Sequence, residues 1–105
     1  MRIGNDIVQI SRIKDPDRLA QKILSDKEME IYSSRANKEE FIAGRFAAKE
    51  AFMKAFGKGF GTAPFNEIEV LYDDAGAPFI LFKGKVYPCS ISHDAGIASA
   101  ITIIE

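Results

Sequence analysis

The sequence predicts an α+β fold in which one long helix packs on a small antiparallel sheet, with short additional helices. Two observations predict it. After a strand-like start, helical patterns run to about residue 56, and short strand patterns separated by turn signals fill the remainder. The chain has 105 residues, of which 47% are hydrophobic. Such a length is typical of one domain, so we expect residues 1–105 to form a single domain with one modest core.

The first half is expected to contain one strand and three helices. Residues 2–10 are rich in β-branched side chains and predict a strand. The Asp15-Pro16 pair is typical of a helix start, and the Ser-Asp-Lys-Glu run at 25–28 is a capping-box pattern that opens a second short helix. The longest helix is expected over residues 37–56, with Gly57 just past its end.

The second half is expected to be β. Alternating or β-branched runs predict strands at residues 65–72, 78–82, 87–92 and 97–104. The turn signals between them are Asp-Asp-Ala-Gly, Lys-Gly-Lys and His-Asp-Ala-Gly. This order predicts a small meander packed on the long helix.

The composition argues against several classes of protein. Lys and Arg number 14 against 15 Asp and Glu, for a net charge of −1, whereas a nucleic-acid binder would show a strong basic excess. Cys89 is the single cysteine, so an intrachain disulfide is impossible and a reduced compartment is indicated. Neither a signal-peptide pattern nor an apolar run of membrane-spanning length is present. We expect a cytoplasmic protein whose partners include no nucleic acid and no membrane.

The long helix contains an unusual polar strip. When residues 41–56 are placed at about 100° per residue, large apolar side chains cover one broad face, with Arg45 and Lys49 together on another sector. The strip opposite the apolar face consists of Ala43, Ala47, Glu50 and Lys54. Its small alanines are expected to leave room for another group to approach closely. A Glu followed by Lys at the fourth position is also the commonest stabilising pair on helix surfaces, so the spacing alone leaves both interpretations open.

Two residues and one segment are unusual in their positions. Asp6 interrupts an apolar strand, which is unfavourable unless the carboxylate is exposed, paired or bound to a cation. Together with Glu50 it would form a two-carboxylate oxygen site, which suits Mg²⁺. His93 lies where a strand ends, and a lone His is more often structural than functional. The glycine-rich segment 57–61 follows a helix, unlike phosphate-cradling loops, so it either stops the helix or lets a ligand approach closely.

Three stretches of the sequence resemble one protein family. They are Gly4 to Val8, Phe41 to Gly57 with its run Arg-Phe-Ala-Ala-Lys-Glu-Ala, and Ser90 to His93. In this order, over nearly the whole chain, they resemble the holo-(acyl-carrier-protein) synthases, the short bacterial type of 4′-phosphopantetheinyl transferase. The resemblance implies the 4′-phosphopantetheinyl transferase fold. It also implies transfer of the phosphopantetheine arm of coenzyme A to a serine of apo-acyl carrier protein, for fatty acid biosynthesis, with release of adenosine 3′,5′-bisphosphate.

The resemblance assigns the catalytic and metal-binding roles to Asp6, Glu50 and Lys54. Asp6 and Glu50 match the ligands of the Mg²⁺ ion that the family holds against the coenzyme A pyrophosphate. Lys54 matches the lysine near that pyrophosphate, where it can stabilise or protonate the departing phosphate. Glu50, directly or through a metal-bound water, is the candidate for activating the acceptor serine.

Coenzyme A binding is implied for a second set of residues. Arg45 and His93 match positions that contact the phosphates of coenzyme A. Gly57, Gly59 and Gly61 match a loop beside the nucleotide.

Docking of the acidic carrier protein is implied for basic residues that follow the first strand. Arg12 matches best, and Arg18 lies nearby with Lys14 and Lys22. Acidic residues are interleaved with them, so an ordinary solvated helix face stays an open interpretation for Arg18 and Lys22. Family members of this length usually form homotrimers with sites between subunits, so a homotrimer is expected. Relatives often have a short helix where this chain has only the Lys-Gly-Lys run at 83–85.

Two other functions would use the same residues. A magnesium-dependent phosphohydrolase would use Asp6, Glu50 and Lys54 to cleave coenzyme A with water in place of the serine. A non-enzymatic module would bind coenzyme A or a partner protein and would tolerate the loss of Glu50.

Overall fold

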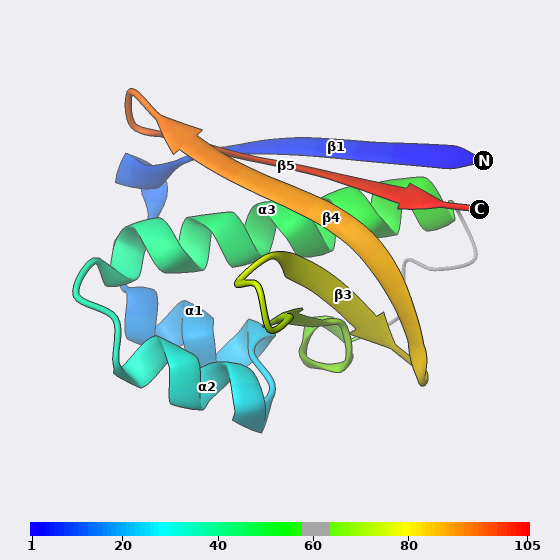
Figure 1. Cartoon of the computed structure of the whole chain (residues 1–105). Helices are drawn as coiled ribbons and strands as arrows, with labels where there is room; N and C mark the ends of the chain where they lie inside the picture. The colour runs from blue at the N-terminus through cyan, green and yellow to red at the C-terminus, as the bar shows by residue number, and fades with distance from the viewer. Residues whose placement is uncertain (58–63) are drawn as a thin grey trace.

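The computed structural model describes residues 1–57 and 64–105, which form one five-stranded antiparallel sheet and three α-helices (Figure 1). The strands are β1 (Arg2–Gln9), β2 (Glu69–Tyr72), β3 (Pro78–Phe82), β4 (Lys85–Asp94) and β5 (Ile97–Ile104). The helices are α1 (Pro16–Ile23), α2 (Asp26–Ser33) and α3 (Lys38–Phe56), with 3₁₀ turns η1 (Ile10–Arg12) and η3 (Phe65–Glu67). The strand order is β1-β5-β4-β3-β2. The predicted α+β class is confirmed.

Local capping interactions explain where the three α-helices begin. The side chain of Asp15 accepts a hydrogen bond from the backbone N–H of Arg18 at the start of α1. Ser25 and Glu28 form the reciprocal capping box of α2, as predicted. Asn37 caps α3 by accepting from the N–H of Glu40. These contacts involve residues three positions apart, which is why the sequence alone predicts the helix starts.

The strand predicted at 2–10 ends one residue earlier, at Gln9, and two other predicted strands differ by more than one residue at an end. The strand predicted at 65–72 is shorter, because η3 occupies its first residues and β2 begins only at Glu69. The carbonyl of Phe65 accepts from the N–H of Ile68 at 3.1 Å, which closes this 3₁₀ turn, and from Lys49 Nζ at 3.0 Å. The strand predicted at 87–92 is longer, since β4 pairs first with β3 and then with β5 as far as Asp94.

Helix α3 lies across one face of the sheet. Helices α1 and α2 lie on the side of α3 that faces away from β1 and β5 (Figure 1). Ala47, Ala48, Ala51 and Phe52 of α3 are completely buried in the core that the helix shares with the sheet. Ala43 is also completely buried. The expectation that the small residues of the strip leave room for another group is therefore wrong for Ala43 and Ala47 as far as a ligand is concerned. Other parts of the protein cover both alanines completely.

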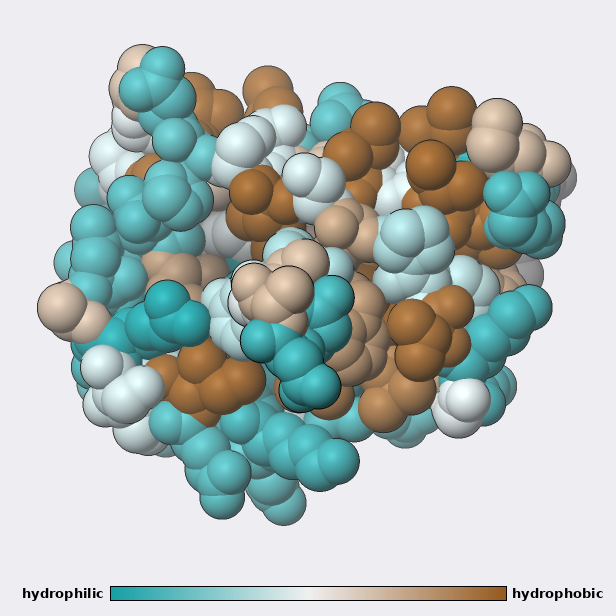
Figure 2. Space-filling model, viewed as in Figure 1, coloured by the Kyte–Doolittle hydropathy of each residue, from teal (hydrophilic) through white to brown (hydrophobic). Residues whose placement is uncertain are grey.

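The other face of the sheet is open and partly apolar. Ile3, Ile7, Val86 and Ile101 are 58%, 66%, 61% and 43% exposed. In Figure 2 much of the hydrophobic surface lies over the strands in the upper part of the view, whereas the lower edge, over α1 and α2, is mostly hydrophilic. None of the helices in the described ranges combines the length and apolar composition needed to cross a bilayer.

Gly4 sets the distance between β1 and α3, and this predicts the effect of a substitution. A Cβ at Gly4 would overlap the backbone carbonyl of Ala51, which cannot move without bending the helix. We expect Gly4→Ala to lower the free energy of unfolding by at least about 2 kcal/mol, as measured by urea denaturation. Gly44→Ala is the matched control, because its Cβ would meet only the Cγ2 methyl of Ile91 at 3.1 Å, and a shift of a few tenths of an ångström relieves that contact. Equal losses for the two variants would contradict the close approach.

Candidate active site

The crossing of β1 and α3 brings together Asp6 and Lys54. Lys54 Nζ lies 2.7 Å from Asp6 Oδ1 and 3.1 Å from the backbone carbonyl of Asn5. The Asn5 amide donates to the carbonyl of Ala100 in β5, which fixes this part of β1 against the sheet. Asp6 therefore satisfies one of the conditions under which a carboxylate is tolerated in an apolar strand, because it is paired.

Glu50 lies one helical turn before Lys54, and the charges of Asp6 and Lys54 both act on its carboxyl group. Its pKa is raised, first by partial burial of the carboxyl and then by the nearby carboxylate of Asp6, while the ammonium of Lys54 lowers it. Two carboxylates and one ammonium leave a surplus negative charge at this crossing. A raised pKa also makes the Glu50 carboxylate a stronger proton acceptor than an ordinary surface glutamate.

A depression of about 350 Å³ opens beside this cluster. Its lining includes Asp6, Glu50, Arg12, Ile13 and Phe46. Arg12 also lines a second, shallow depression of about 210 Å³ together with Lys14, Arg18 and Lys22. The basic residues predicted to dock a carrier protein are thus contiguous with the predicted catalytic carboxylates.

The donor set at this crossing is compatible with Mg²⁺. The described ranges contain no group of three or more His, Cys, Asp or Glu side chains arranged for a metal ion, which argues against a closed structural site there. Mg²⁺ differs, because it is commonly held by one or two carboxylates and completes its shell with water and substrate phosphates. Burial and then the nearby Asp6 carboxylate raise the pKa of Glu50, and a cation bound by both side chains would offset the second of these effects.

Arg45 and His93 lie together in a different place, around a cavity of about 410 Å³. Arg45 is only 3% exposed, and its guanidinium lies 4.2 Å from the ring centre of Phe41 and 4.9 Å from that of Tyr72. His93 is about half exposed, with Nε2 3.5 Å from Glu40 Oε1. Among the described residues, this cavity and the depression at Asp6 and Glu50 share no lining residue.

The predicted glycine loop is described only at its first residue. Gly57 ends α3 with a φ of 93°, as expected for a helix stop, and the Arg2 guanidinium donates to the carbonyl of Phe56 at 2.6 Å. Gly59 and Gly61 lie outside the described residues.

The sequence did not reveal the buried pair formed by Glu28 and Lys49. Lys49 Nζ lies 2.6 Å from Glu28 Oε1, and both side chains are completely buried. The capping-box pattern of Ser25 and Glu28 predicts a helix start but not this pairing. The only signal was the pair of cations, Arg45 and Lys49, four positions apart among apolar residues, which together require a carboxylate.

Comparison with known proteins matches residues 2–102 to the family model of the 4′-phosphopantetheinyl transferase superfamily. The chain belongs to this superfamily. The holo-[acyl-carrier-protein] synthase of Streptococcus uberis is 41% identical, over 97% of this chain and 93% of that protein. The resemblance seen in the sequence is confirmed.

Solved structures of the superfamily have the same fold. The holo-(acyl-carrier-protein) synthase of Bacillus anthracis, in complex with CoA (3′,5′-ADP), superposes with a TM-score of 0.85 at 38% identity, over 96% of this chain and 92% of that one. The Helicobacter pylori holo-[acyl-carrier-protein] synthase, in complex with coenzyme A, gives 0.82 at 32% identity, over 98% and 99%.

The charge cluster predicts how the pKa of Glu50 responds to its neighbours. Asp6→Asn removes a repelling carboxylate, so we expect the pKa of Glu50 to fall toward its ordinary value. Lys54→Met removes an attracting ammonium, so we expect a further rise. Carboxyl ¹³C NMR titration of the glutamate side chains measures both, with Asp74→Asn, in an exposed turn, as the control. A Glu50 pKa that responds to neither change would show that burial alone raises it.

Proposed function

We propose that this chain transfers the 4′-phosphopantetheine arm of coenzyme A to a serine hydroxyl of apo-acyl carrier protein, in the cytoplasm, for fatty acid biosynthesis. The products are holo-acyl carrier protein and adenosine 3′,5′-bisphosphate. The main support is the cluster of Asp6, Glu50 and Lys54 at the crossing of β1 and α3, in a member of this superfamily. We propose that residues 1–105 act as a single domain.

In this proposal the reaction is a phosphoryl transfer in which Glu50 and Lys54 act on the reacting groups. The serine oxygen forms a bond to the phosphorus next to the pantetheine arm, and the bond from that phosphorus to the bisphosphate oxygen breaks. Glu50, directly or through a water, accepts the serine proton, which its raised pKa favours. Lys54 donates hydrogen bonds to the departing phosphate.

We propose that Asp6 and Glu50 hold a Mg²⁺ ion when coenzyme A is bound. Such an ion supplies positive charge that offsets the negative charge of the pyrophosphate during the transfer. Lys54 is 55% exposed and pairs with Asp6 at its surface end, so its ammonium is free to turn from Asp6 to a substrate phosphate.

Arg45 and His93 are the proposed ligands of further coenzyme A phosphates, with Gly57, Gly59 and Gly61 beside the nucleotide. Since the cavity at Arg45 is separate from the depression at Glu50, we propose that one copy of the chain completes the site of another in a homotrimer. The exposed apolar face of the sheet offers a surface that association would cover.

The groove lined by Arg12, Lys14, Arg18 and Lys22 is the proposed docking surface for the acidic carrier protein. It adjoins the catalytic depression through Arg12, which lines both. A carrier seated there would have its acceptor serine near Glu50. Complementary charge of this kind raises the association rate and fixes orientation.

Glu50→Gln tests the mechanism, because it keeps the shape of the side chain but cannot accept the proton. We expect transfer to fall by at least about 100-fold, measured as intact mass of the carrier after incubation with coenzyme A and Mg²⁺. Glu39→Gln, in the first turn of the same helix, is the matched control. Chelation of the metal should stop the wild-type reaction. Retained transfer by Glu50→Gln would contradict the mechanism, and an unmodified carrier with cleaved coenzyme A would identify a phosphohydrolase.

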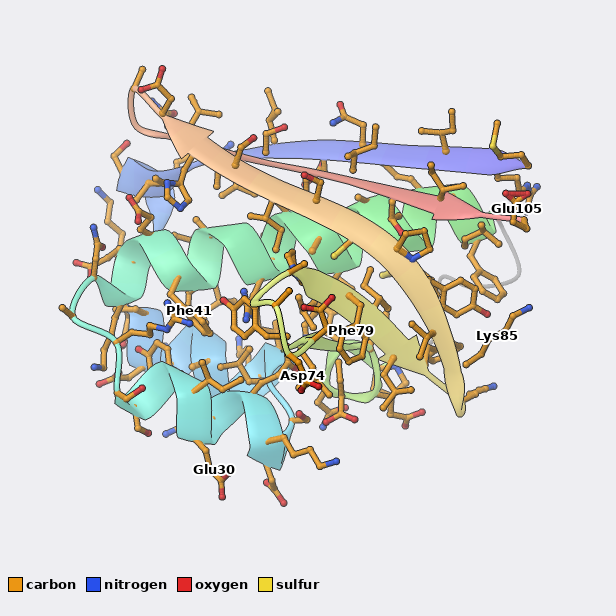
Figure 3. All side chains as sticks on the ribbon, viewed as in Figure 1. Glu30, Phe41, Asp74, Phe79, Lys85 and Glu105 are labelled. Carbon is orange, nitrogen blue, oxygen red and sulfur yellow. The ribbon has the colours of Figure 1, made fainter. Side chains whose placement is uncertain are left out.

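Arg12→Glu tests the docking surface. We expect the KM for the carrier to rise by about ten-fold or more, because a charge is reversed against an acidic partner, while the KM for coenzyme A changes by less than about two-fold. Lys85→Glu, at the far end of β4 (Figure 3), is the control of equal charge change. Equal effects of Arg12→Glu on both KM values would place the carrier elsewhere.

A further inference from the structure

Arg45 is a buried cation whose hydrogen-bonding capacity is largely unused. Its Nε and Nη2 atoms are buried and have no hydrogen-bond partner among the described residues. The guanidinium instead lies against the rings of Phe41 and Tyr72, and Figure 3 shows Phe41 on the side of α3 that faces α1 and α2. Stacking on rings fixes the plane of a guanidinium but constrains sliding within that plane only weakly. A second interaction is therefore needed to fix the position of the Arg45 guanidinium at the cavity wall.

That interaction is with Glu28. Arg45 Nε lies 4.0 Å from Glu28 Oε2, which is too far for a hydrogen bond but is a close approach of opposite charges. The two side chains are only 4% and 0% exposed, so solvent ions screen the attraction weakly. The position of Arg45 therefore depends on where the carboxylate of Glu28 is held.

Glu28 is held from three directions. Its Oε1 atom accepts from Lys49 Nζ at 2.6 Å and from the N–H of Ser25 at 3.1 Å. Its Oε2 atom accepts from the N–H of Val70 in β2 at 3.0 Å. The carboxylate is thus tied to α2, α3 and β2 at once and cannot move toward Arg45.

Lys49 uses all of its hydrogen-bond donors inside the protein. Besides Glu28, its ammonium donates to the carbonyls of Ile23 at 2.6 Å and Phe65 at 3.0 Å. Glu28 and Lys49 therefore form a saturated, neutral pair. The positive charge left over among the three groups belongs to Arg45, which lines the cavity of about 410 Å³ together with Arg35 and His93.

We propose that the Glu28–Lys49 ion pair is a positioning device for phosphate binding: it holds the Arg45 guanidinium at the cavity wall, with its charge unneutralised, for a phosphate group of coenzyme A. This inference rests on the proposed function, which supplies the ligand. Lys49 prevents Arg45 from closing onto Glu28, because the ammonium already occupies the carboxylate. Glu28 in turn prevents Arg45 from sliding away.

The test replaces the pair by uncharged residues of similar shape, Glu28→Gln with Lys49→Met, with and without Arg45→Met. The pair replacement removes one charge of each sign, so the summed charge of the three groups is unchanged and any change in affinity reports the position of Arg45. Isothermal titration calorimetry with coenzyme A gives the Kd. We expect the pair replacement to raise the Kd about ten-fold when Arg45 is present, and by less than about two-fold when position 45 is Met. The KM for the carrier should stay within about two-fold, because its proposed docking groove lies elsewhere.

Thermal unfolding first establishes that each variant is folded. An unchanged Kd in the folded pair variant would overturn the inference, as would an equal rise with and without Arg45, which would mark a purely structural effect. Should the pair variant fail to fold, Lys49→Met alone decides. Without the Lys49 ammonium on its carboxylate, Glu28 leaves room for Arg45 to close onto it and be neutralised, so coenzyme A binding is expected to weaken, and an unchanged Kd would again overturn the inference. If the wild type itself fails to bind coenzyme A, the proposed function fails, and this inference with it.

Discussion

The contact on which the remaining structure depends is the close approach of β1 to α3 at Gly4. No side chain separates the strand from the carbonyl of Ala51 there, and the completely buried alanines of α3 extend this tight packing along the sheet. Alternate residues of a strand share a face, so Asp6 follows Gly4 onto the helix-facing side of β1. The packing that forms the core therefore also places the carboxylate of Asp6 beside Lys54 and near Glu50. The core packing at Gly4 and the charge cluster at Asp6 therefore depend on the same crossing of β1 and α3.

The two lysine–carboxylate pairs of α3 differ in physical character. Lys49 and Glu28 are buried and saturated with hydrogen bonds, so their pair offers little net stabilisation over a well-packed apolar alternative, but it fixes α2, η3 and β2 relative to α3. Lys54 and Asp6 are partly exposed, and a pair of that kind contributes between about zero and 1 kcal/mol. A weak pair is readily exchanged. That suits a lysine that must leave its partner carboxylate when a phosphate arrives, whereas the buried pair suits a scaffold that must not move.

The features that depend on contacts between residues close in sequence could be predicted, and those that depend on distant residues could not. The helix starts depend on contacts three positions apart, such as Ser25 with Glu28, and these were predicted. The strand at 65–72 was predicted too long because its first residues form η3, where the carbonyl of Phe65 accepts from the N–H of Ile68 and from Lys49, a residue distant in sequence. The alanine strip was misread for the same reason, since helical periodicity shows which residues share a face but not what covers it. That Asp6 and Glu50 form one site was a hypothesis from their residue types, supported by the family resemblance, because periodicity within one element cannot show where β1 crosses α3.

The proposed phosphate-binding residues and the carboxylates line different depressions, and this separation underlies the proposed association of copies. Arg45 and Glu50 are five positions apart on α3, which places them about 140° apart around its axis, and they line different depressions. In the proposed homotrimer, a single coenzyme A would contact Arg45 from one copy and Glu50 from another. Each copy would then present two different surfaces to its neighbours, one through each depression. Where these two surfaces meet head to tail, the assembly stays finite only if successive copies close on themselves, as they do in the proposed homotrimer.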